Sequence, residues 1–127
     1  MFTKDRLPDQ INGDELGIVN FDDSDGGGTH WVAYFNSSSL PENEYVIYFD
    51  SYGLTAPDQL EKYLRTSGKK IKSNTSEIQN VRSIMCGYYC IYVLRELMNG
   101  RKFYDIIYEF SSTPTKENEN KIKNIFS

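Results

Sequence analysis

Two cysteines and a single histidine are the residues of this chain best suited to nucleophilic chemistry. Cys86 precedes Gly87 near the start of an apolar stretch that predicts a helix. The amino end of a helix carries partial positive charge and free N–H groups, which favour the thiolate, the nucleophilic form of cysteine. Gly87 would let a substrate carbonyl approach the backbone amides closely. The alternative for Cys86 is a small buried residue in a core helix.

The candidate base and its partner come from two predicted strands. His30 is the only histidine, so any imidazole base must be this residue. Asp50 ends the neighbouring strand, where an acid can orient the base of a catalytic triad. Each also has an ordinary explanation, as a hydrogen-bonded strand histidine and as a turn residue. Cys90 lies one helical turn beyond Cys86, where the field of the helix end has faded, and we expect it to belong to the core.

Other kinds of site lack the residues that they need. One histidine and two cysteines are too few for a zinc site, and we expect no metal and no cofactor. The triple glycine at 26–28 has neither the lysine nor the following helix of a phosphate-binding loop. Placed beside His30, it could instead let an extended peptide backbone lie close.

Charge and hydropathy narrow the range of partners. A net charge of −4 argues against a nucleic-acid binder held by phosphate neutralisation. No segment approaches the ~20 apolar residues that span a bilayer, and the start of the chain has no apolar signal-peptide core. We therefore expect an unsecreted protein, without membrane contact, whose thiols stay reduced.

The length of 127 residues fits a single domain, which we place at residues 1–110. Residues 29–35 and 45–50 are apolar at consecutive positions, which favours central strands covered on both faces, and the loop between them favours an antiparallel pair. A shorter strand is expected at 17–21. The ten tyrosines indicate either a core with several polar edges or an exposed groove that holds an extended ligand.

Helical spacing appears in three further segments. A start pattern at Thr55–Asp58 is followed by a short helix that Gly68 should end. A short strand is expected near Ile71. Residues 84–98 are apolar almost all round, which predicts a helix in the middle of the domain, and 103–110 form another amphipathic segment. We expect 111–127 to be a polar, loosely held C-terminal segment.

Five sequence blocks, in their order along the chain, resemble the adenovirus protease (adenain) family. The blocks are Ile18–Asn20, Gly27–Trp31, Tyr48–Gly53, Gln79 and Cys86–Cys90. The chain looks most similar to the adenain-like proteases of virophages and of Maverick/Polinton virus-like elements. More distantly, it resembles the proteases that process SUMO and other ubiquitin-like proteins. The resemblance covers roughly residues 17–110.

This resemblance implies an α+β fold of the adenain and SUMO-protease type. A central helix would carry Cys86 and pack on a small mixed or antiparallel sheet that carries His30 and Asp50. Cys86 would be the nucleophile, His30 the general base and Asp50 the third member of the triad. Gln79 would donate a side-chain N–H to the oxyanion hole, together with the backbone amide of Cys86.

Three residues would bind substrate: Trp31 as a wall of the groove, and Gly28 and Gly87 beside the peptide. The activity implied is that of a thiol endopeptidase that cuts capsid or core protein precursors near glycine, in the virion or the host-cell interior. Adenovirus proteases are stimulated by a disulfide-tethered peptide and by DNA. Whether this chain needs an activating peptide stays open. Its acidic net charge disfavours stimulation by DNA, and we expect a monomer.

Alternatives to a capsid protease also stay open. A peptidase for SUMO or ubiquitin conjugates would use the same triad, as would an acetyltransferase with a His-acid-Cys arrangement. A binding module that kept the fold without catalysis belongs to a different class. Substrate panels, acyl-CoA consumption and the effect of replacing Cys86 would separate these possibilities.

Overall fold

A mixed five-stranded sheet, with strand order β1-β2-β3-β4-β5, organises the chain. The computed structural model describes residues 2–3, 9–20, 30–75, 78, 86–110 and 116–126. The strands are β1 (Phe2–Thr3), β2 (Glu15–Asn20), β3 (Trp31–Asn36), β4 (Tyr45–Phe49) and β5 (Lys70–Ser73), and the helices are α1 (Asp58–Arg65), α2 (Cys86–Met98), α3 (Phe103–Ile107) and α4 (Lys116–Phe126). The three central strands are antiparallel neighbours, whereas β1 and β5 run parallel to the strands beside them.

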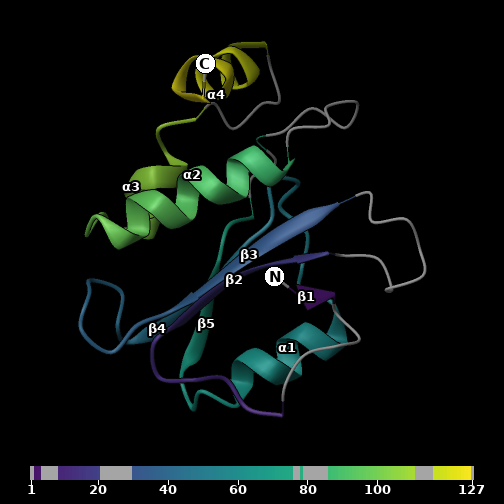
Figure 1. Ribbon diagram of the computed structural model, residues 1–127, viewed down its shortest axis with the longest axis vertical. Helices are drawn as coiled ribbons and strands as arrows, with labels where there is room; N and C mark the ends of the chain where they lie inside the picture. Colours follow the sequence, from purple (N-terminus) through teal and green to yellow (C-terminus); the bar gives the residue numbers. More distant parts are fainter. Residues whose placement is uncertain are drawn as a thin grey trace.

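Both faces of the sheet are covered by helices (Figure 1). Ala33 and Phe35 of β3 point toward α2. The residues that alternate with them, Val32 and Tyr34, belong to the core on the α1 side. Because side chains alternate along a strand, a strand that is apolar at consecutive positions must be buried on both sides. The prediction of an antiparallel central pair with two covered faces is confirmed.

The α1 side of the sheet is closed by a tyrosine–carboxylate cluster. The Tyr34 hydroxyl and the Tyr63 hydroxyl, the latter at 2.5 Å, both donate to one carboxylate oxygen of Glu15. Burial acts to raise the pKa of Glu15, but these hydrogen bonds outweigh burial, so the pKa lies below its ordinary value. Buried tyrosines with hydroxyls on carboxylates fit the predicted core with polar edges.

Helix boundaries follow the expected stop signals more closely than the expected starts. Gly68, the expected stop, adopts φ of 77° just beyond α1, a conformation that glycine adopts without strain, and Gly100 does the same beyond α2 with φ of 90°. At the start of α1, however, Thr55 does not cap the helix. The cap position is Pro57, which makes no side-chain capping bond.

The structure corrects two expectations about helices. First, α2 is not buried all round, because one stripe of it is exposed, with Tyr88, Ile91 and Met98 each 44–51% accessible. The sheet and the other helices cover the remaining sides. Second, the segment expected to be loosely held contains α4, whose Asn118 and Ile122 are buried.

Candidate active site

The site begins where two central strands meet at one edge. His30 directly precedes β3 and Asp50 directly follows β4. Because these strands are antiparallel, the start of one lies beside the end of the other. The Nε2 atom of His30 lies 2.8 Å from Oδ1 of Asp50, with the His30 side chain 12% exposed and that of Asp50 fully buried. The structure therefore brings together the predicted base and its acid.

Several bonds hold the Asp50 carboxylate and its backbone in place. Oδ1 also accepts the Tyr52 backbone N–H at 2.8 Å. The Asn74 side chain accepts the Asp50 N–H at 3.1 Å and donates to the Asp50 carbonyl at 2.6 Å. Since an ionised carboxylate only accepts hydrogen bonds, the His30 Nε2 must carry the proton that it shares with Asp50. Asp50 thus fixes both the orientation and the tautomer of the imidazole.

Two tyrosines, one on each side of Asp50 in the sequence, interact with this pair. The Tyr52 ring stacks on the His30 imidazole, with ring centroids 4.4 Å apart and planes 18° from parallel. Burial raises the pKa of Tyr48, and the charge of Asp50 raises it further, so that this phenol stays neutral. Tyr52 limits rotation of the imidazole, as a site that relies on ring orientation requires.

Helix α2 starts at Cys86, and its first turns are tied to the strand that follows His30. The Cys90 thiol donates to the Trp31 carbonyl at 3.4 Å, and Cys90 is fully buried. The prediction that Cys90 belongs to the core is confirmed. Cys86 is described as the first residue of α2, while its side chain lies outside what the structure describes. Cys86 therefore lies one helical turn before Cys90, and Cys90 is bonded to Trp31, the residue that follows His30.

Of the four remaining predicted site residues, the structure describes two. Trp31 is partly buried and packs against the α2-side core. Gly87 is partly exposed, and a Cβ added there would meet no described atom within 4 Å. Gln79 and Gly28 lie outside the described residues.

Sequence reasoning missed two residues that organise the site. Asn74 comes just after β5 and reaches Asp50 from 24 positions away, so no local pattern marks it. Tyr52 stands inside the Asp-Ser-Tyr-Gly block, and its position two residues after the acid was the available signal.

The described part of the chain has neither a cluster of metal-ligating side chains nor a membrane-spanning helix. No group of three or more His, Cys, Asp or Glu side chains within it could hold a metal ion. None of its helices is long and apolar enough to cross a membrane.

Comparison with known proteins identifies the fold. No protein-family model matches the chain, and no curated protein does. Among solved structures, the chain is similar to the crystal structure of ASFV pS273R protease, with a TM-score of 0.61 and 22% sequence identity over 81% of this chain. It spans only 40% of the length of that protein. The chain thus shares its fold with part of a known protease.

Proposed function

We propose that this protein is a cysteine peptidase, with Cys86 as nucleophile, His30 as base and Asp50 as the acid that orients the base. The observation that carries the proposal is the buried His30–Asp50 pair, at 2.8 Å, beside the helix that starts with Cys86. A histidine held in one tautomer by a buried carboxylate is what an imidazole base requires. The fold shared with a protease adds support.

The proposed reaction starts with proton transfer from the Cys86 thiol to Nδ1 of His30, since Nε2 is bonded to Asp50. The thiolate attacks the peptide carbonyl, and His30 returns the proton to the leaving amine. Water then hydrolyses the thioester with His30 again as base. The backbone N–H of Cys86 and the Gln79 side chain would stabilise the oxyanion, where losing one donor typically costs ~2.7–4 kcal/mol.

The proposed substrates are capsid or core protein precursors, cut near glycine in the virion or the host-cell interior. Trp31 and Gly28 flank His30 in the sequence, and Gly87 follows Cys86. Together they would form a groove narrow enough to favour residues without side chains. The described residues leave the Cβ position of Gly87 open, which supports the approach of a substrate to this end of α2.

The test compares two cysteines of the same helix. Capsid-type precursors are coexpressed with the native chain, with Cys86→Ala and with Cys90→Ala, and the products are identified by mass spectrometry. We expect Cys86→Ala to abolish cleavage while Cys90→Ala keeps most of it. SUMO and ubiquitin conjugates tested in parallel decide between the two substrate classes.

The same proteins are treated with iodoacetamide, which alkylates accessible thiolates. Labelling should be confined to Cys86 and should slow when His30 is replaced by alanine. Cleavage that survives Cys86→Ala but is lost in Cys90→Ala would refute the assignment of the nucleophile. A chain that cleaves nothing and whose Cys86 labels no faster than a simple thiol would point to a binding module.

A further inference from the structure

Helix α4 is fastened to the helix that carries Cys86. Ile122 is fully buried in the core shared by α2 and the sheet, and the Tyr89 hydroxyl donates to the Glu119 carboxylate. At the other end of α4, the Phe126 ring lies 5.3 Å from that of Tyr88. Contacts along its length thus fix α4 against the first half of α2.

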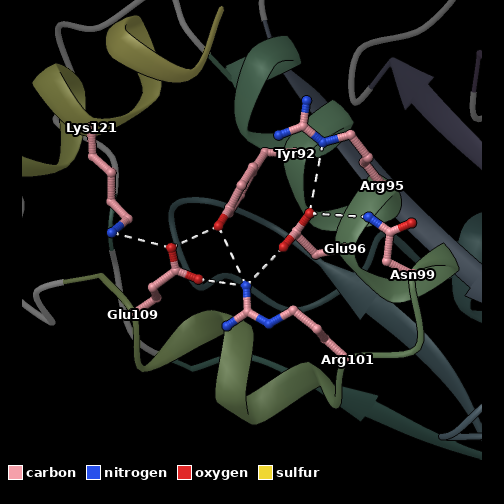
Figure 2. Close-up of polar contacts among 7 residues, drawn as sticks. All are labelled: Tyr92, Arg95, Glu96, Asn99, Arg101, Glu109 and Lys121. Carbon is pink, nitrogen blue, oxygen red and sulfur yellow. Dashed lines mark hydrogen bonds and ion pairs between the residues drawn. The ribbon is translucent and has the colours of Figure 1, made fainter.

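A charged network fixes α4 to the chain beyond α3 as well (Figure 2). Lys121 lies 3.1 Å from the Glu109 carboxylate, which also accepts bonds from Arg101 and from the Tyr92 hydroxyl, both at 2.6 Å. Burial acts to raise the pKa of Glu109, but its hydrogen bonds outweigh burial and lower it, so the carboxylate stays charged at neutral pH. The position of α4 is therefore set from two sides.

One side chain of α4 bonds to a segment outside α2 and α3. Asn118 is 2% exposed, and its Nδ2 donates to the Ile78 carbonyl at 2.9 Å. The Ile78 N–H donates in turn to the Ser51 carbonyl at 2.8 Å, next to Asp50. Both backbone groups of Ile78 are thus held, one by the strand end that carries the acid and one by α4.

The carbonyl held by Asn118 belongs to the peptide unit that joins Ile78 to Gln79. Ile78 directly precedes Gln79 in the sequence, and both the N–H and the carbonyl of Ile78 are held by hydrogen bonds. We infer that Asn118 is a positioning residue for Gln79, and that α4 aligns the oxyanion donor with the helix bearing Cys86. This inference rests on the proposed peptidase function, in which Gln79 is that donor.

The test uses the full chain and a fluorogenic peptide built on the cleavage site found with the coexpressed precursors. Asn118→Ala should lower kcat by about 10- to 100-fold with KM within about twofold, because a misplaced donor weakens binding of the transition state and not of the substrate. Asn120→Ala is the matched control, being an exposed asparagine of the same helix, and should match the native chain.

Two further readouts separate positioning from a merely structural role. Alkylation of Cys86 by iodoacetamide should be unchanged in Asn118→Ala, because the His30–Asp50 pair is untouched. In a double-mutant cycle, Gln79→Ala should remove the effect of Asn118→Ala, so the double variant should be as active as Gln79→Ala alone. Should Asn118→Ala fail to fold, Asn118→Asp, which has nearly the same volume and no N–H donor when ionised, replaces it.

Native kcat in the folded Asn118 variant, additive losses in the cycle, or a parallel fall in Cys86 alkylation would each overturn the inference. Failure of the proposed function has a different signature. In that case the native chain and Cys86→Ala would be equally inactive from the start.

Discussion

Two glycines near the central strands show how differently the two sides of this molecule are built. A Cβ on Gly17 of β2 would come within 2.7 Å of the Tyr34 ring, on the strand opposite. A Cβ on Gly87, at the start of α2, would meet no described atom within 4 Å. Packing among the described residues requires the first glycine and not the second. In the proposed function, the requirement for Gly87 comes from the substrate.

The polar groups of the two regions follow the same division. The Glu15 carboxylate is occupied by two tyrosine hydroxyls and by the Asn12 backbone, in a cluster that stabilises the α1 side. The Asp50 carboxylate instead accepts a hydrogen bond from His30, whose partner in the proposed chemistry is Cys86. We therefore expect changes on the α1 side to alter stability alone, and changes near the start of α2 to alter activity.

After the loss of the nucleophile itself in Cys86→Ala, the largest expected effect is that of Asp50→Ala. Without the acceptor, the His30 ring loses its fixed tautomer, and kcat/KM should fall by about 10²- to 10⁴-fold in a peptide-cleavage assay. Asp50→Asn is the control, because its amide oxygen can still accept from His30 and Tyr52, and it should retain more activity. Equal losses in the two variants would mean that charge, and not orientation, is what Asp50 supplies.

A smaller effect, confined to stability, is expected for Gly17→Ala. The Tyr34 ring would have to shift, which should lower the free energy of unfolding by about 1–3 kcal/mol in urea denaturation. Gly13→Ala is the matched control, since a Cβ there meets no described atom within 4 Å. Cleavage per folded molecule should be unchanged, and a loss of catalysis would break the proposed division between the two sides.

The smallest effect on stability, with the opposite sign, is expected for Gly87→Ala. Alanine in a helix is favoured over glycine, so the free energy of unfolding should rise by up to about 1 kcal/mol. The added methyl group would nevertheless displace a substrate, and kcat/KM should fall by about tenfold. A variant that is both more stable and fully active would show that Gly87 does not face the substrate.

The parts of the fold that were predictable from sequence are those whose cause is local. The strands around Trp31–Phe35 and Tyr45–Phe49 are buried on both faces. A strand buried on both faces has apolar residues at consecutive positions, which is the pattern that the sequence displays. The His30–Asp50 pair was predictable because His30 lies at the start of one strand and Asp50 at the end of the next, and these strands were predicted to be antiparallel neighbours.

The parts that were not predictable depend on distant residues. The polarity of α4 hid a narrow apolar stripe at Ile122, Ile125 and Phe126, whose spacing is helical. The exposed stripe of α2 depends on which elements happen to cover it. The reach of Asn118 to Ile78 crosses 40 positions, and no pattern within either segment indicates it.

The outer strand β5 has a consequence for how copies of this protein meet. An edge strand offers unpaired N–H and C=O groups, which a second chain can use to extend the sheet into a fibre. In β5, lysines alternate with other residues, and Lys70 is exposed while Lys72 lies 3.2 Å from Glu42. Adding a strand of a second copy there would bring like charges together and disturb that ion pair. The charges of β5 therefore disfavour pairing of this edge with a strand of a second copy.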